Sequence, residues 1–139
     1  MIASGQINLE GVLSEVTALF ALYEAALMKN DLVTLDQLFW QSPLTVRFGT
    51  AENLYGINAI RAFRQARNTG TLKRILLHSQ ITTYGEDFAT TTTEFIRQDR
   101  LLGRQSQTWV RLPEGWRVVS AHISLSEDSA GSCSQNMGS

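Results

Sequence analysis

The sequence is poor in the residues from which metal centres and disulfides are built. Its 139 residues include one cysteine, Cys133, and two histidines, His78 and His122. A single cysteine excludes an internal disulfide and a cysteine-based zinc site, and two histidines so far apart do not make a metal site alone. The 13 acidic residues are scattered, without the close spacing that holds a hard cation. We therefore expect no metal site.

A charge excess of either sign is absent as well. Twelve Lys and Arg oppose 13 Asp and Glu, which leaves a formal net charge of −1, whereas a nucleic-acid-binding domain normally has a basic excess. The most apolar stretch, residues 11–28, contains Glu15 and Glu24 and has helical periodicity, which argues against a transmembrane helix. No Lys- or Arg-led apolar segment opens the chain. These features predict a cytoplasmic protein that binds neither nucleic acid nor membrane.

Apolar residues make up 43% of the chain and charged residues 18%, the balance of one folded domain. Asn8 is expected to cap a helix that starts near Leu9. One apolar stripe runs along this helix at three- and four-residue spacing, formed by Val12, Val16, Leu19, Phe20, Tyr23 and Leu27. A shorter helix is predicted over residues 32–40, and Ser42 and Pro43 end it.

The hydrophobic period then changes to that of strands. Strands are predicted at 45–50, 72–84, 88–97, 103–112 and 116–125, with a polar loop at 51–54. This order predicts an α+β domain over residues 1–126, with its helices on one side of a curved, mainly antiparallel sheet. Such a sheet wraps around the first helix and leaves a cone-shaped cavity open at one end. Residues 127–139 have no apolar period and are predicted to be a flexible tail.

A third helix is expected after Gly56, between the first strand and the long ones. Its inward face is predicted to carry Ile57, Ile60 and Phe63. Its outward face is predicted to be basic and solvated, with Lys73 and Arg74 nearby in the sequence. The arginines of this outward face are Arg61, Arg64 and Arg67.

Two stretches of the sequence are similar to signatures of a known family. They are Phe-Gly-Thr-Ala-Glu-Asn-Leu-Tyr-Gly-Ile at 48–57, continuing through 59–64, and Gly-Arg-Gln-Ser-Gln-Thr-Trp-Val-Arg at 103–111, continuing through 115–122. Over residues 7–125 the chain resembles the AtzH-like family of the NTF2-like (cystatin-like, SnoaL-like) superfamily. The resemblance implies a cone of three N-terminal helices packed on a curved sheet.

The resemblance also implies an activity. The family's best-described reaction is a decarboxylating amidohydrolase step that converts 1,3-dicarboxyurea to allophanate in the breakdown of cyanuric acid and s-triazines. It implies an enzyme that needs no cofactor, takes a small anionic urea-like substrate and uses Tyr23 and Arg47 as its catalytic pair. Because members are found beside amidase-type enzymes, it also implies a functional association with an amidase.

The residues alone leave the roles of this pair open. Tyr23 lies on the apolar stripe, where it either fills the core or presents its hydroxyl as a proton donor at the mouth of the cone. Arg47 alternates with Val46 and Phe48. It is exposed if those two face the core, and it lies inside the cone if they do not. A buried arginine needs an anion, and a substrate carboxylate fits its planar fork.

A further set of residues is predicted to bind the substrate, since amide, hydroxyl, imidazole and indole groups suit a urea-like ligand. Its members are Trp40, Asn53, Gln107, Trp109, Ser120 and His122. For the glutamines the alternative is a solvated strand face, and for His122 it is an interior histidine with satisfied hydrogen bonds. Asn53 and its neighbour Glu52 either shape the mouth of the pocket or cap the third helix.

Other functions remain open at this point. The chain could act on a related substrate of oxalurate or ureide breakdown, or serve as a non-catalytic accessory subunit of an amidase. A ketosteroid-isomerase-like proton transfer is the third alternative, although it needs a carboxylate base inside the cavity. We also expect a homodimer, because the outer face of such a sheet is predicted to carry more apolar and aromatic area than a monomer leaves in water.

Overall fold

The computed structural model describes residues 1–70 and 72–129 as helices, strands and connecting loops. The helices are the short 3₁₀ helix η1 (Ser4–Gln6), α1 (Glu10–Lys29), α2 (Leu32–Leu38) and α3 (Ile57–Ala66). The strands are β1 (Val46–Phe48), β2 (Asn53–Tyr55), β3 (Arg74–Tyr84), β4 (Phe88–Arg97), β5 (Leu101–Leu112) and β6 (Gly115–Ser129).

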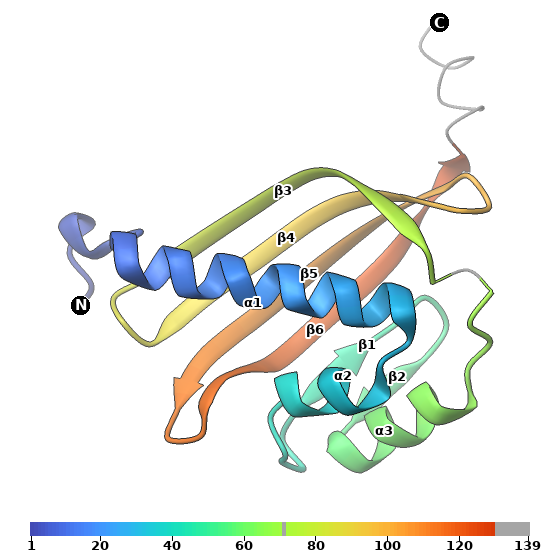
Figure 1. The fold of residues 1–139 in the computed structure, drawn as a ribbon, viewed down its shortest axis with the longest axis horizontal. Coiled ribbons are helices and arrows are strands. Elements are labelled where there is room, and N and C mark those ends of the chain that lie inside the picture. Colours follow the sequence, from blue (N-terminus) through green and yellow to red (C-terminus); the bar gives the residue numbers. More distant parts are fainter. Residues whose placement is uncertain (71, 130–139) are drawn as a thin grey trace, which may run out of the picture.

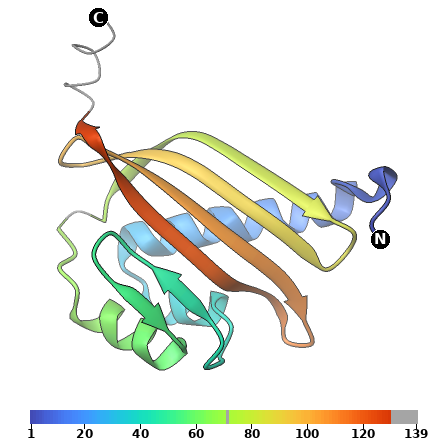
Figure 2. The same ribbon diagram turned by 180° about the vertical axis from the view of Figure 1, so that it is seen from behind.

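The strands form one six-stranded sheet in the order β2-β1-β6-β5-β4-β3. Only the β1–β6 pair is parallel, and the other neighbours are antiparallel. The long strands bend around α1, which lies across one face of the sheet, while α2 and α3 gather beside the short β1–β2 hairpin (Figure 1). From behind, none of the described helices lies over the other face of the sheet (Figure 2). The predicted α+β class and the curved, mainly antiparallel sheet are confirmed.

The apolar stripe of α1 packs into the core as its spacing predicts. Val16, Phe20, Tyr23 and Leu27 are all buried. The largest fully buried side chain, Trp109 of β5, belongs to the same hydrophobic cluster as Val16, Tyr23 and Leu27. By length and composition alone, α1 could cross a membrane. In the structure, however, the apolar stripe of this helix packs against the sheet, as in an amphipathic core helix of a folded domain.

The N-terminal end of α1 differs from the prediction that Asn8 caps the helix. Asn8 does not cap the helix: it has a φ of 58°, and its Oδ1 accepts a hydrogen bond from the backbone N–H of Thr83. The asparagine therefore ties the N-terminal segment to β3. At the other end, Asn30 closes the helix in the left-handed conformation. Asp31 then caps α2 by accepting from the backbone N–H and the hydroxyl of Thr34.

Several boundaries move relative to the predictions. The segment 51–54, expected to be loop, contributes to strand β2, whose three residues are too short to show a period-two pattern. Helix α2 ends at Leu38 rather than Trp40. Strand β6 extends to Ser129, past the predicted domain end at 126. The rest of the predicted tail, residues 130–139, lies outside the described residues.

Candidate functional site

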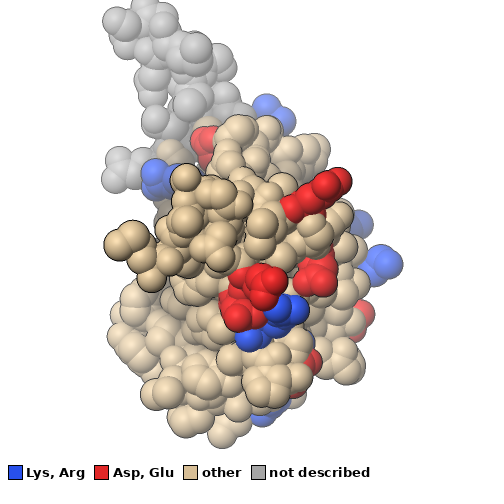
Figure 3. Space-filling model, turned by 90° about the vertical axis from the view of Figure 1, so that its left-hand side faces the viewer, with Lys and Arg blue, Asp and Glu red and all other residues tan. Residues whose placement is uncertain are grey.

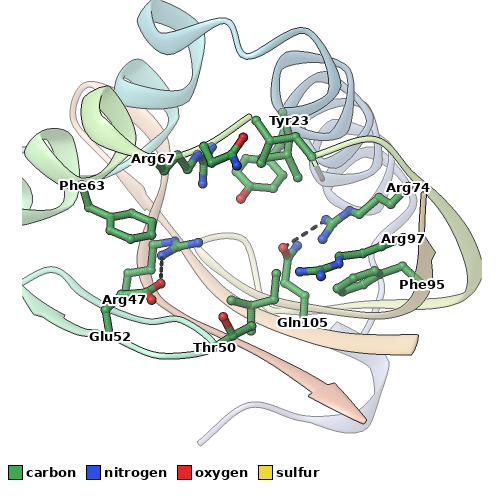
Figure 4. Close-up of a pocket in the computed structure, with 14 residues that line it drawn as sticks. Tyr23, Arg47, Thr50, Glu52, Phe63, Arg67, Arg74, Phe95, Arg97 and Gln105 are labelled. Atoms are coloured by element: carbon green, nitrogen blue, oxygen red, sulfur yellow. Dashed lines mark hydrogen bonds and ion pairs between the residues drawn. The ribbon is translucent and has the colours of Figure 1, made fainter. Parts of the chain in front are cut away.

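A cavity of about 210 Å³ opens between the C-terminal half of α1, the end of α3 and the concave face of the sheet. Its wall carries the guanidinium groups of Arg47, Arg67, Arg74 and Arg97, which reach it from four different elements or their ends. The close-up shows these groups on both sides of the cavity, with Tyr23 between them (Figure 4). The curved sheet thus gathers cations that are far apart in the sequence.

Tyr23 is a core residue whose hydroxyl also faces the cavity. Its ring is 3% exposed and belongs to the core cluster, with its centroid 6.3 Å from that of Phe39. Its hydroxyl points into the cavity (Figure 4). The apolar stripe of α1 therefore anchors the ring, and the curve of the sheet leaves room in front of the oxygen.

Arg47 faces the inside of the cone because of its register on the sheet. It pairs with Ala121 of β6, which in turn pairs with the buried Gln107 of β5. The side chain is 7% exposed, and its Nη1 donates to Oε1 of Glu52 at 3.1 Å. Its guanidinium lies 5.2 Å from the centroid of the Phe63 ring. The buried alternative for Arg47 is thus the correct one.

Gly49 makes room for the carboxylate that Arg47 binds. A Cβ at this position would overlap the carboxylate of Glu52 and approach Nη1 of Arg47. A larger residue at this position would push the end of the Glu52 side chain away from Arg47, so glycine leaves the space in which Glu52 reaches back to the strand.

Arg74 is held by a second, buried ion pair. Its Nε donates to Oε2 of Glu24 at 3.1 Å, its Nη2 donates to the other carboxylate oxygen, and Nη2 also donates to Oε1 of Gln105 at 3.0 Å. The guanidinium stacks on the ring of Phe95 at 4.3 Å. The two hydrogen bonds to Glu24 fix the orientation of the Arg74 guanidinium on the cavity wall.

The predicted solvated face of α3 is wrong for two of its three arginines. Arg64 is only 3% exposed and stacks on Phe39 at 4.2 Å, and Arg67 is half-buried and lines the cavity. The helix period explains this, because Arg64 and Arg67 follow Ile57 at i+7 and i+10 and so share its inward face. Arg61 lies off that face, where it forms an ion pair with Asp36.

Arg74 was also expected near solvent, and its burial corrects that expectation. Of the basic residues near the third helix, Lys73 is exposed as predicted. Arg97, which the sequence did not single out, lies on the cavity wall and pairs with Asp99.

The electrostatics of α3 follow from this burial. Loss of solvent lowers the pKa of Arg64 to about 10; Tyr23 opposes the shift, while the positive charges of Arg47 and Arg67 add to it. Burial also lowers the pKa of Arg67, with the charge of Arg47 as the next cause. Both arginines keep their protons at neutral pH, so they place positive charge beside Tyr23.

Only some of the predicted binding residues lie on the concave side. Gln107 and Trp109 are buried there, and both hydrogen bond to the hydroxyl of Thr91, but neither lines the cavity. Gln105, two residues before Gln107 on the same strand face, lines it instead. Its Nε2 is buried without a hydrogen-bond partner among the described residues.

Ser120 and His122 face the opposite side of the sheet because β6 contains a bulge. Thr108 pairs with Ser120, whereas the next residue, Trp109, pairs with Val118, so Val119 is extra. An extra residue reverses the alternation of side chains beyond it. Both residues are exposed, and the His122 ring meets the ring of Phe48 at 5.8 Å. Their predicted place in the pocket is wrong.

Trp40 and Asn53 also lie away from the cavity. Trp40 follows α2, where its backbone N–H donates to the carbonyl of Val118, and its side chain is half-buried outside the cavity wall. Asn53 is exposed on β2. Its neighbour Glu52 reaches the cavity instead, as does Thr50 of the same connection between β1 and β2.

Within the part of the chain that the structure describes, no group of three or more His, Cys, Asp or Glu side chains could hold a metal ion. Apart from the carboxylate of Glu52, which is paired with Arg47, the polar groups on the cavity wall are mainly donors, namely guanidinium, amide and phenol groups. Donors suit a ligand rich in oxygen acceptors, above all a carboxylate.

Three helices on a bent, mainly antiparallel sheet, with a polar cavity inside the bend, define a protein of the NTF2-like, cystatin-like class. Solved structures of that class agree with this assignment. A cystatin-like protein from Burkholderia xenovorans has 46% sequence identity and a TM-score of 0.82, covering 86% of this chain and 95% of its own. An NTF2-like superfamily protein from Salmonella enterica has 28% identity and a TM-score of 0.69, covering 87% of this chain and 96% of its own.

The family model named AtzH-like matches residues 5–129, so the chain belongs to the AtzH-like family. A protein of unknown function from Pectobacterium atrosepticum, assigned to the DUF3225 family, has 52% identity and a TM-score of 0.89. The match covers 91% of this chain and all of that one. No curated protein matched the chain. Family and fold together support a small-molecule-binding or catalytic NTF2-like protein.

Proposed function

We propose that the chain is a decarboxylating amidohydrolase that acts on a small carboxylated urea, with 1,3-dicarboxyurea as substrate and allophanate as product. The observation that carries the proposal is the cavity itself, in which the hydroxyl of Tyr23 faces a wall of guanidinium groups. Membership of the AtzH-like family supports the choice of substrate.

Each residue has a role that follows from its chemistry. Arg47 binds one substrate carboxylate with its planar fork and fixes the direction of that group. The unpartnered amide of Gln105 donates to the urea carbonyl. Tyr23 supplies or relays a proton to the nitrogen that bears the departing carboxylate.

The bond changes balance with one proton. The N–C bond to one carboxylate breaks, its electron pair stays on nitrogen, and the nitrogen takes the proton. Carbon dioxide leaves, and the remaining urea monocarboxylate is allophanate. If water adds to the carboxyl carbon first, the same N–C bond breaks and the carbon leaves as bicarbonate.

A covalent mechanism like that of serine or cysteine amidases has no support in the cavity. The described residues that line it include no serine, cysteine, lysine or histidine, so neither a Ser–Lys nor a Cys–His pair can form there. A carboxylated urea does not require a nucleophile, because protonation of nitrogen weakens the bond that breaks.

A second candidate is proton transfer of the ketosteroid-isomerase kind, favoured by one observation. That chemistry needs a carboxylate base in the cavity, and Glu52 lines it. Both oxygens of Glu52 are already engaged, however: one accepts from Nη1 of Arg47 and the other from the backbone N–H of Ala51. The decarboxylation uses the pair as it stands, which is why we prefer it.

Assays of the purified chain with 1,3-dicarboxyurea and with oxalurate, with and without a partner amidase, test the proposal. We expect turnover of dicarboxyurea by the chain alone. Preference for oxalurate would move the substrate to ureide breakdown. A rate change confined to the amidase would instead identify an accessory subunit.

A further inference from the structure

The positive charges around the cavity are not fully matched by acids. Of the guanidiniums around the cavity, three have a carboxylate partner among the described residues: Arg47 with Glu52, Arg74 with Glu24 and Arg97 with Asp99. The two arginines on the inward face of α3, Arg64 and Arg67, have no ion-pair partner there. The cavity region thus has two positive charges without a counter-ion, in a chain whose formal net charge is −1.

Of these two residues, Arg67 is the one that lines the cavity. It follows the last turn of α3, and its guanidinium lies 6.0 Å from the centroid of the Phe63 ring, which Arg47 approaches at 5.2 Å. Its Nε and Nη2 are buried and have no hydrogen-bond partner among the described residues. Buried donors of this kind are satisfied when a ligand brings acceptors.

Arg64 strengthens the attraction without touching the ligand. It is 3% exposed and absent from the cavity wall. Its Nη1 donates to the carbonyl of Leu35 over a long distance, 3.5 Å, and Tyr23 helps to stabilise its charge. Its charge therefore adds to the positive potential at Arg67 in a poorly solvated place. A carboxylate beside Arg67 would reduce the repulsion among Arg47, Arg64 and Arg67.

We propose that Arg67 forms a second carboxylate subsite, separate from the contact made by Arg47, and that it selects ligands with two carboxylates over ligands with one. The inference rests on the proposed function for its view of the cavity as a substrate site. It assigns to Arg67 a specificity role that the sequence pattern, with Arg67 on a solvated face, did not indicate.

Binding of two inert probes, glutarate and butyrate, tests the subsite by calorimetry at fixed ionic strength. Glutarate has the five-atom chain of dicarboxyurea with a carboxylate at each end, and butyrate lacks one of them. We expect the wild-type protein to prefer glutarate, and Arg67→Gln to weaken glutarate binding about tenfold or more while leaving butyrate within about twofold. Arg61→Gln, which removes a charge from the outer face of the same helix, is the matched control and should change neither affinity.

The melting temperature without ligand gives a second readout. Because Arg67→Gln removes a charge that has no partner in the empty cavity, we expect it to melt at the same temperature as the wild type or higher. Equal binding of glutarate by the wild type and Arg67→Gln would overturn the proposal, and so would a lower melting temperature for that variant, the mark of a structural role. Since neither probe contains the N–C bond that breaks in the proposed reaction, the binding test of the subsite does not depend on catalysis. If dicarboxyurea is not a substrate but the glutarate preference depends on Arg67, only the proposed function fails.

Discussion

Tyr23 is the side chain on which the proposed proton transfer depends. Tyr23→Phe removes one hydroxyl and keeps the ring that packs near Phe39. We expect turnover to fall on the order of 10²-fold or more, while the free energy of unfolding changes by only about 1 kcal/mol. Steady-state kinetics and thermal melts of the same preparation measure the two effects. Near-normal turnover by the folded variant would reduce Tyr23 to a core residue.

Arg47 is predicted to work through the shape of its guanidinium as well as its charge. Arg47→Lys keeps the charge but loses the planar two-point contact with a carboxylate. We expect it to lose nearly as much kcat/KM as Arg47→Ala. If the lysine variant kept most of the wild-type activity, the planar contact would not be needed, and the assignment of a carboxylate to Arg47 would be contradicted.

At the scale of elements, the strands and helices that could be predicted are those with strong periodicity. The β4 range of 88–97 matches the structure, and α1 differs by little at either end. The third helix was located correctly, and its predicted inward residues Ile57 and Ile60 are buried. Arg64 and Arg67 were wrongly assigned to solvent, although their spacing continues that of the two isoleucines. The helical spacing of Arg64 and Arg67 already indicated the inward face, but their charge led to the opposite assignment.

The bulge in β6 explains why the candidate site could be predicted only in part. Because Val119 is an extra residue, Val118 and Ser120 face opposite sides of the sheet although they are two positions apart. A simple in–out alternation along the sequence therefore cannot place both residues correctly. Tyr23 and Arg47 came from the family resemblance, and the structure brings both to one cavity. Gln105, Arg67 and Arg74 reach that cavity through pairings between distant segments that a single sequence does not reveal.

Strand β5 offers a direct test of packing beneath the cavity. Gly103 pairs with Phe95, and a Cβ on Gly103 would overlap the Phe95 ring on which Arg74 stacks. Because that ring is 1% exposed and cannot move into solvent, we expect Gly103→Ala to lower the free energy of unfolding by about 1–3 kcal/mol. Denaturant melts measure the change.

A glycine in α1 supplies the control for this substitution. A Cβ on Gly11 would meet no atom within 4 Å, so Gly11→Ala should leave stability unchanged or raise it by up to about 1 kcal/mol. Equal effects of the two substitutions would show that the fit between Gly103 and Phe95 is not a constraint.

For the whole molecule, acidic and basic side chains are balanced differently at the two ends. At the end that carries the β3–β4 turn, Asp87, Glu15 and Glu86 raise the pKa of Arg111, and acidic side chains lie beside basic ones on that face (Figure 3). The cavity, toward the C-terminal part of α1, instead carries Arg67, which has no ion-pair partner among the described residues. We therefore expect an anion to be attracted to the cavity more than to the end with the β3–β4 turn.

A homodimer remains a prediction, but its basis changes. The outer face of the sheet is not mainly apolar at its centre, where Thr92, Ser106 and His122 are exposed. Large exposed apolar side chains lie toward its edges instead, among them Ile75 at 69% and Tyr55 at 66%. Because none of the described helices lies over this face (Figure 2), we still expect two copies to associate. Light scattering that gave a mass near 15.5 kDa at micromolar concentration would contradict the prediction.

The proposed decarboxylation is tested most directly by the stoichiometry of the reaction catalysed by the isolated chain in the presence of EDTA. We expect each 1,3-dicarboxyurea consumed to yield one allophanate and one carbon dioxide or bicarbonate, with no partner protein, and we expect chelation to leave the rate unchanged. No conversion above the uncatalysed rate, or conversion that stops with EDTA and returns with one divalent ion, would contradict the proposed metal-free reaction.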